Sequence, residues 1–157
     1  MCYSFESPKV FDKLLLPADS VYRKAITIAN PLGEDFSIMR TVSLNGMLTS
    51  LATNYNRRNK NVRLYEMGNI YIPQELPLTE LPDERMQFTL GMYGDGDFFN
   101  MKGVVEEFFE KIGMKGREKY DPNAGKSFLH PGRQANIIYD GKVVGYICKL
   151  HPSVCAD

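Results

Sequence analysis

Only two residues, Asp140 and Gly141, separate two runs in which apolar and polar side chains alternate. The runs cover residues 134–139 and 142–150. Asp-Gly favours a two-residue turn whose twist matches that of two antiparallel strands. The end of the chain therefore predicts a β-hairpin.

Upstream of this hairpin, the hydrophobic spacing predicts two amphipathic helices. In residues 46–59 the apolar side chains fall on one helical face; they are Met47, Leu48, Leu51, Ala52 and Tyr55. A second helix, around residues 104–112, is followed by Gly113, a natural helix C-cap. The other predicted elements are a helix over 7–16, strands over 25–29, 62–72 and 86–93, and a loop over 73–83.

Several strands with few helices predict an α+β fold, a mostly antiparallel sheet flanked by helices. Gly68 interrupts the strand over 62–72, and we expect a bulge there. The length of 157 residues suits one domain over 1–157. Because both ends are abrupt, we expect this domain to be a fragment of a longer subunit.

Composition excludes some classes of protein. Nineteen Lys and Arg balance nineteen Asp and Glu, so the whole chain is not a strongly basic nucleic-acid binder. No apolar run reaches the ~20 residues that a membrane helix needs. The three cysteines form no Cys-x-x-Cys pair, which favours free thiols in a reducing compartment. We therefore expect a cytoplasmic protein with no membrane partner.

The common site motifs all fail. Gly125-Lys126-Ser127 resembles the end of a phosphate-binding loop, but Tyr120 stands where that loop needs glycine. Gly94-x-Gly96 lacks the third glycine of a dinucleotide loop. His130 and His151 have no surrounding metal-ligand pattern. The sequence thus predicts no catalytic residue and no metal ligand.

Two local features remain as candidate contacts. One is a basic cluster made of Arg57, Arg58, Lys60 and Arg63. It is either a solvated helix end or a contact for phosphate or RNA. The other is a turn that carries His130 and Arg133. That turn is either a Pro-Gly turn needed by the fold or part of a small-ligand pocket.

Several stretches of the chain, in order, resemble the bacterial phenylalanyl-tRNA synthetase beta subunit. The resemblance is to one region of that large subunit, its catalytic-like module, and it covers nearly the whole chain. The stretches are 3–5, 7–9, 30–41, 54–58, 62–68 (VRLYEMG), 98–106 (FFNMKGVVE), 129–133 (LHPGR) and 150–152 (LHP).

The resemblance implies a class II synthetase fold in a module that is itself non-catalytic. It implies docking to the catalytic alpha subunit, in a complex that aminoacylates tRNA(Phe) and uses ATP and magnesium. No cofactor is expected in this fragment. Class II enzymes hold ATP with an Arg-x-Glu motif, whereas here Arg63 and Glu66 are one residue further apart. In a strand, that spacing places the two side chains on opposite faces.

The chain also departs from the family pattern. Cys148 and Lys149 stand where the family usually has Gly and Glu, and the segment over 93–97 is short and lacks Trp. Either a true deletion or a loop outside this sequence explains the short segment.

The leading hypothesis is an interaction module of a phenylalanine–tRNA ligase beta subunit. Met47, Leu48, Leu51 and Tyr55 are the expected alpha-subunit interface, although so regular an apolar stripe is equally consistent with core packing. The alternatives are an RNA-contacting module that uses the basic cluster, and a degenerate pocket near His130 and Arg133. An exposed apolar patch would also let the isolated domain self-associate.

Overall fold

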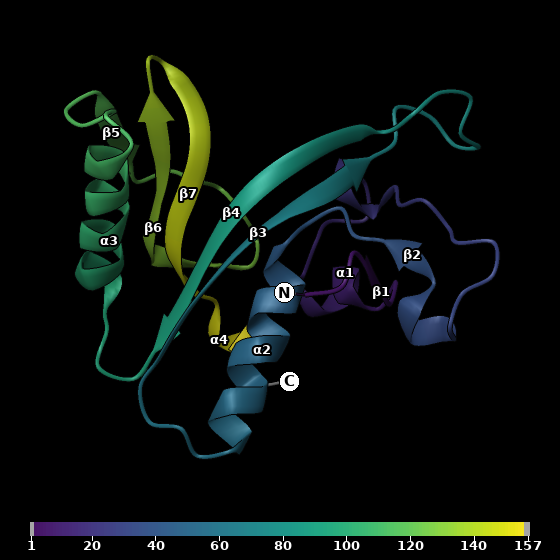
Figure 1. Cartoon of the computed structure of the whole chain (residues 1–157), viewed down its shortest axis with the longest axis horizontal. Helices are drawn as coiled ribbons and strands as arrows, with labels where there is room; N and C mark the ends of the chain where they lie inside the picture. The colour runs from purple at the N-terminus through teal and green to yellow at the C-terminus, as the bar shows by residue number, and fades with distance from the viewer. Residues whose placement is uncertain (1, 156–157) are drawn as a thin grey trace. The chain divides into compact units, whose positions relative to one another are not determined.

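The computed structural model describes residues 2–155 and divides at Gly94 into two compact units. Both units combine antiparallel strands with a few helices, as Figure 1 shows. The predicted α+β class with antiparallel sheets is therefore confirmed. The prediction that residues 1–157 form one domain stays a prediction. No helix among the described residues is long and apolar enough to span a bilayer.

The N-terminal unit is built around one long helix and one long two-stranded ribbon. Helix α2 is followed directly in the sequence by the two strands of the ribbon, β3 and β4. The elements, with two short 3-10 helices, are β1 (Phe5–Glu6), α1 (Val10–Lys13), Val21–Arg23, Glu34–Phe36, β2 (Ile38–Met39), α2 (Leu44–Asn56), β3 (Val62–Ile72) and β4 (Asp83–Tyr93).

Strands β3 and β4 pair without a break, from Val62 opposite Tyr93 to Ile72 opposite Asp83. Directly opposed residues share a face, so the ribbon has an inner face toward α2 and an outer face away from it. At Gly91 on the inner face, an added Cβ would lie 2.7–2.8 Å from side-chain atoms of Met47 and Leu51. Glycine is required there because α2 packs directly on the strand backbone.

The predicted bulge at Gly68 is wrong, because the pairing runs through Gly68 opposite Gln87 without a shift. Glycine stands at this position because the guanidinium of Arg40 occupies the space that a Cβ would need. A local pattern could not reveal this reason, since Arg40 is 28 residues away in the sequence.

Two further predictions in this unit need correction. The predicted strand over 25–29 is reduced to one isolated bridge, between Thr27 and Ile38. The predicted helix over 7–16 is limited to Val10–Lys13, and it stops where Leu15 takes a left-handed conformation with φ 52°. The predicted helix over 46–59 exists, but it begins at Leu44 and ends at Asn56.

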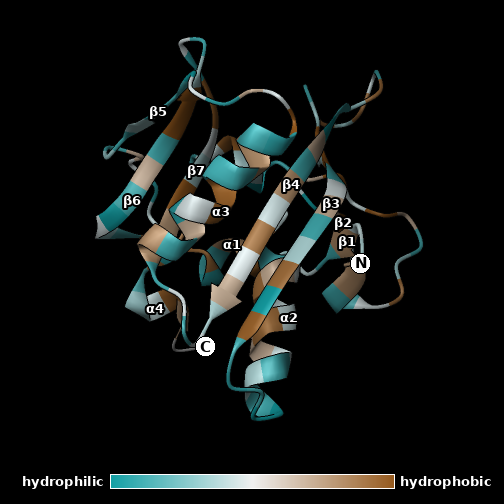
Figure 2. Cartoon of the chain, turned by 60° about the vertical axis from the view of Figure 1, so that its left-hand side comes forward, coloured by the Kyte–Doolittle hydropathy of each residue, from teal (hydrophilic) through white to brown (hydrophobic). Residues whose placement is uncertain are grey.

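The C-terminal unit packs one helix against a three-stranded antiparallel sheet in the order β5-β6-β7. The Phe109 ring stacks on Tyr139, with centroids 6.0 Å apart. Figure 2 shows this unit coloured by hydropathy. Its elements are α3 (Phe98–Lys111), β5 (Glu118–Asp121), β6 (Leu129–Tyr139), β7 (Lys142–Leu150) and α4 (Pro152–Cys155).

The predicted hairpin is confirmed, with Asp140 at φ 47° and Gly141 at φ 77° joining β6 to β7. Both values are positive, as a type I′ turn requires. The second predicted helix is also confirmed, and it begins with a capping box between Asp97 and Asn100.

Candidate functional site

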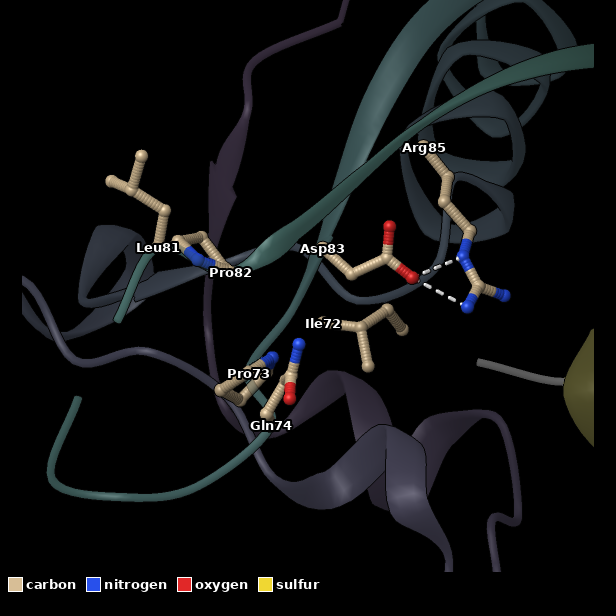
Figure 3. Close-up of a pocket in the computed structure, with 7 residues that line it drawn as sticks. All are labelled: Ile72, Pro73, Gln74, Leu81, Pro82, Asp83 and Arg85. Carbon is tan, nitrogen blue, oxygen red and sulfur yellow. Dashed lines mark hydrogen bonds and ion pairs between the residues drawn. The ribbon is translucent and has the colours of Figure 1, made fainter. Parts of the chain in front are cut away.

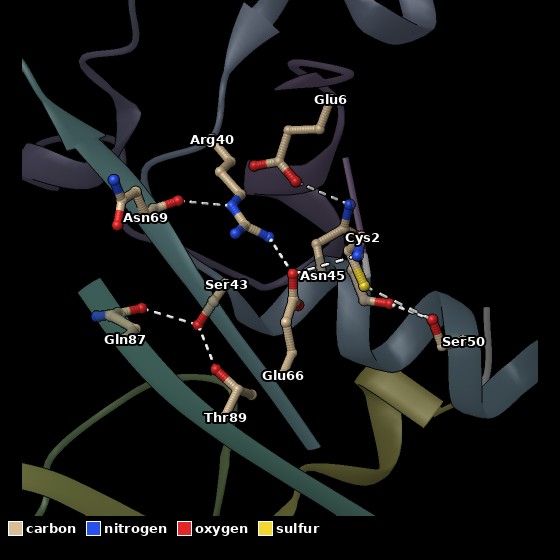
Figure 4. Close-up of polar contacts among 11 residues, drawn as sticks. Cys2, Glu6, Arg40, Ser43, Asn45, Ser50, Glu66, Asn69, Gln87 and Thr89 are labelled. Carbon is tan, nitrogen blue, oxygen red and sulfur yellow. Dashed lines mark hydrogen bonds and ion pairs between the residues drawn. The ribbon is translucent and has the colours of Figure 1, made fainter. Parts of the chain in front are cut away.

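A buried ion pair lies between the segment that follows β2 and the inner face of β3. Arg40 is 3% exposed and Glu66 is 6% exposed. Arg40 Nη1 donates to Glu66 Oε1 at 3.1 Å, and Arg40 Nε donates to the carbonyl of Asn69 at 2.8 Å (Figure 4). Both contacts attach the start of the α2 segment to the ribbon.

The N-terminal segment joins the same cluster. The backbone N–H of Cys2 donates to Glu66 Oε1 at 3.2 Å, and Asn45 Nδ2 donates to Glu6 Oε2 at 2.9 Å. The Cys2 thiol also lies 3.7 Å from the Ser50 hydroxyl. These contacts connect the N-terminal segment and β1 to helix α2 and strand β3, as Figure 4 shows. We call Cys2, Glu6, Arg40, Asn45 and Glu66 the buried polar cluster.

The two buried carboxyl groups differ in pKa. Burial raises the pKa of Glu6 to about 7, against smaller opposing effects of Asn45 and Arg40. Burial also acts to raise the pKa of Glu66, but the Cys2 hydrogen bonds and the Arg40 charge outweigh it and lower that pKa. Glu6 Oε1 and Glu66 Oε2 have no hydrogen-bond partner among the residues described. The cluster therefore holds one Arg charge between a readily protonated and an ionised carboxyl group.

A second polar contact fixes the N-terminal end of α2. The Ser43 hydroxyl donates to Gln87 Oε1 at 2.8 Å and lies 2.7 Å from the Thr89 hydroxyl (Figure 4). Ser43 precedes α2 but does not cap it with its side chain. Its hydroxyl bonds β4 instead, so it positions the helix on the ribbon.

The cavities of this unit include one beside the buried polar cluster and one at the end of the ribbon. One, of about 530 Å³, adjoins the buried polar cluster and is bordered by the rings of Tyr3, Phe5 and Phe36. The other, of about 440 Å³, lies where the ribbon opens into the 73–82 loop (Figure 3). There Arg85 Nε donates to Asp83 Oδ2 at 2.6 Å, so the charged groups at its edge are already paired.

The metal-binding and nucleophilic capacity of these groups follows from their geometry and burial. Within residues 2–155, no three His, Cys, Asp or Glu side chains gather closely enough to hold a metal ion. Burial raises the pKa of the Cys2 thiol, and burial raises the pKa of Cys148 to about 12. Both thiols therefore stay protonated near neutral pH and are poor nucleophiles.

The four residues predicted as a subunit interface lie in different environments. Met47 is buried, and it packs with the half-buried Leu51 over Gly91. Leu48 is half-buried. Tyr55 is 69% exposed and makes an edge contact with Tyr93, ring centroids 5.7 Å apart. The part of the stripe that faces β4 is thus core, and Tyr55 leads from it to the surface.

The basic cluster lies around the turn that follows α2. Arg57 is the C-cap of α2, Arg58 is left-handed at φ 61°, and Lys60 follows. All three are exposed, as is Arg63 on the outer face of β3. Arg63 and the buried Glu66 lie on opposite faces of the strand, as the sequence spacing predicts.

His130 and Arg133 both lie near the start of β6. His130 Nδ1 accepts a hydrogen bond from the backbone N–H of Gly132 at 3.2 Å, and Arg133 is exposed. Neither residue lines either of the two cavities above. The hydrogen bond from Gly132 to His130 is a local contact that stabilises a turn.

The model of a known protein family matches the whole sequence, residues 1–157: the phenylalanyl tRNA synthetase beta chain CLM domain. The chain belongs to this family. Several phenylalanine–tRNA ligase beta subunits resemble it closely. The subunit of Clostridium acetobutylicum is 46% identical over 99% of the chain, that of Clostridium tetani 41% over 97%, and that of Symbiobacterium thermophilum 36% over 98%.

The chain spans only about 19% of the length of the two Clostridium relatives. It therefore corresponds to one CLM domain within a much larger type of subunit.

The buried polar cluster of this CLM domain is not predicted by any motif in the sequence. One signal was present, because Glu66 alternates with Leu64, Gly68 and Ile70 on what proves to be the buried face of β3. A carboxylate at a core position needs a cationic or hydrogen-bonding partner. The sequence alone gives no means of choosing Arg40 as that partner.

Proposed function

We propose that this CLM domain is a non-catalytic, class II synthetase-like module that docks the catalytic alpha subunit of a phenylalanine–tRNA ligase. Through that docking it supports aminoacylation of tRNA(Phe) in the cytoplasm. The observation that carries the proposal is the match of all 157 residues to the CLM domain family.

The build of the N-terminal unit supports a docking role. Its most polar interior feature, the buried polar cluster, joins backbone segments and makes no reactive nucleophile. The long helix α2 lies on an antiparallel ribbon, with Tyr55 69% exposed at its C-terminal end. We propose that Tyr55 and the neighbouring half-buried Leu48 contribute to the docking surface, while Met47 and Leu51 hold α2 on the ribbon.

A calorimetric titration with separately purified alpha subunit tests this proposal. The alpha subunit of Clostridium acetobutylicum suits it, because a 46% identical relative comes from that organism. We expect Tyr55→Asp to weaken binding at least about tenfold, since it places a charge in an apolar contact. Leu81→Asp is the matched control, because Leu81 is 87% exposed in the 73–82 loop. Equal binding of the alpha subunit by both variants would show that α2 is not part of the docking surface.

A second candidate function is RNA contact through the basic cluster. The exposure of Arg57, Arg58 and Lys60 around one turn favours it. This function predicts that tRNA affinity falls steeply as salt is added, because Arg and Lys side chains that bind phosphates release counterions from the RNA. Replacing Arg57 and Arg58 with Gln would then flatten the salt dependence. A salt-independent affinity, or no binding, would reject this function for the isolated domain.

A further inference from the structure

Glu6 has an unused hydrogen-bond acceptor in the wall of the cavity of about 530 Å³. This volume is within the range of small-molecule sites, roughly 300–1,000 Å³. Glu6 is 7% exposed, and its Oε2 accepts from Asn45 at 2.9 Å. Its Oε1 has no hydrogen-bond partner among residues 2–155 (Figure 4). A ligand that donates a hydrogen bond to this buried carboxyl group would therefore satisfy an unmet acceptor.

The buried charges beside this cavity do not balance. Among the described residues, the charged side chains that are less than one-tenth exposed are Glu6, Arg40 and Glu66. Arg40 is bonded to Glu66 at 3.1 Å, so an ionised Glu6 is left without a bonded counter-charge. A buried charge without such a partner favours a ligand of opposite sign. The excess negative charge therefore points to a cation.

The other titratable groups of the cavity wall act more weakly on a ligand. Lys9, Lys13 and Asp35 line the cavity, but all three are exposed, so water and salt screen their charges. The Cys2 thiol also lines it, and burial raises the pKa of that thiol, which keeps it neutral near pH 7. Glu6 is thus the acid that distinguishes this cavity from an ordinary charged surface.

Three aromatic rings form an apolar part of the same wall. Tyr3 and Phe5 stack with centroids 5.4 Å apart, and Phe36 meets them edge-on at 6.1 and 5.9 Å. Tyr3 is 71% exposed and Phe36 38% exposed, so the ring cluster remains open to contact. Aromatic rings bury apolar surface and attract ammonium groups. They suit a cation that carries an apolar body.

We propose that this cavity binds a small organic ammonium ion with an aromatic or aliphatic body. The ammonium group pairs with the Glu6 carboxylate, and the apolar body lies against Tyr3 and Phe36. The inference concerns a ligand of this chain alone and does not rest on alpha-subunit docking.

A titration of the full chain with benzylamine, followed by nuclear magnetic resonance, tests the proposal. Benzyl alcohol is the matched control, because it has the same ring and no charge. We expect benzylamine to shift the backbone amide signals of Phe36 and Gly46, which line the cavity, with a Kd of about 1 mM or tighter. Benzyl alcohol should bind at least about tenfold more weakly. Absence of these shifts, or equal affinity for both compounds, would overturn the proposal.

Two variants separate Glu6 from the exposed acid of the same cavity. Glu6→Gln keeps an oxygen that can accept from Asn45 but removes the charge, so it should weaken benzylamine binding at least about tenfold. Asp35→Asn should change the Kd less than about twofold, because Asp35 is exposed. Circular dichroism checks that both variants are folded. Unchanged binding by folded Glu6→Gln, or an equal loss in Asp35→Asn, would contradict the role of Glu6.

The pH dependence gives an independent readout. Burial raises the pKa of Glu6 to about 7, and only its ionised form pairs with an ammonium ion. The affinity of the wild-type chain for benzylamine should therefore fall about tenfold from pH 8 to pH 6, as Glu6 takes up a proton. The residual affinity of Glu6→Gln should vary much less over this range. The same pH dependence in both chains would show that Glu6 does not hold the ligand.

Discussion

Arg40 and Glu66 form an ion pair at 3.1 Å, and each side chain is more than nine-tenths buried. The pair joins two chain segments that pack on one another in the N-terminal unit. Removing one partner would leave the other charge buried without compensation. The stability of the unit therefore depends on keeping both charges or replacing both.

Arg40→Leu is expected to lower the free energy of unfolding by about 3–5 kcal/mol, because Glu66 would remain buried without its counter-charge. Urea denaturation followed by circular dichroism measures the change. The matched control is Lys111→Gln, which removes an exposed pair with Glu107 and should cost about 0.5 kcal/mol or less. A loss for Arg40→Leu no larger than that of the control would contradict a structural role for the pair.

Glu6 should make stability depend on pH. Its pKa is about 7 in the folded chain, against 4.5 as its ordinary value, so the folded chain holds the Glu6 proton more tightly than the unfolded chain. This contribution is fully present below pH 4.5 and is lost as the pH rises to about 7. At about 1.4 kcal/mol per pKa unit, the loss amounts to about 3 kcal/mol.

Glu6→Gln should remove this loss, because Gln does not titrate and keeps an oxygen that can accept from Asn45. Unfolding free energies measured between pH 4.5 and 7.5 compare the two chains, with the exposed Glu107→Gln as control. The wild-type chain and the control should decline together relative to Glu6→Gln. Parallel curves for all three chains would show that Glu6 ionises normally.

Gly91 should not tolerate alanine. The new Cβ would lie 2.7–2.8 Å from Met47 and Leu51, so α2 would have to move away from β4. We expect Gly91→Ala to lower the free energy of unfolding by about 1–3 kcal/mol, the usual cost of overpacking. In Gly145→Ala the nearest atom, on Ile137, is 3.8 Å away, which is ordinary contact. Equal stabilities of the two variants in thermal denaturation would contradict the close packing of α2.

The described cysteines should differ in reactivity toward a thiol reagent. Burial raises the pKa of Cys148 to about 12, so almost none of it is thiolate at neutral pH, whereas Cys155 is exposed. Alkylation followed by peptide mass spectrometry should show Cys155 labelled more than about tenfold faster than Cys148 in the folded chain. The difference should vanish in denaturant. Similar rates in the folded chain would mean that Cys148 is accessible.

The sequence predicted best the elements that local chemistry determines. The β6–β7 hairpin follows from Asp140-Gly141, and α3 follows from its apolar period and Gly113. The residues that hold α2 to the ribbon could not be predicted in the same way. Gly68 and Gly91 are needed because side chains from distant parts of the sequence occupy the space that a Cβ would fill. In the sequence alone, such a glycine in a strand looks the same as a glycine at a bulge. The Arg40–Glu66 pair is likewise a long-range contact.

The apolar stripe of α2 also combines a feature that local sequence predicts with one that only long-range packing decides. Its period predicts a helix with one apolar face, and the structure confirms the helix. The period does not say whether that face meets the chain's own sheet or another protein. Met47 meets the sheet, and Tyr55 is 69% exposed. Only the three-dimensional packing distinguishes the residue that contacts the sheet from the residue that is exposed.

Sedimentation velocity of the chain mixed with the alpha subunit tests docking most directly. Each protein is first run alone and checked for folding, and the two are then combined in equal amounts. A docking module should give a new boundary with the combined mass of the chain and the alpha subunit, and the free species should decline together. Two unchanged boundaries, with both proteins folded, would contradict the proposal that these 157 residues contain a surface sufficient for alpha-subunit docking.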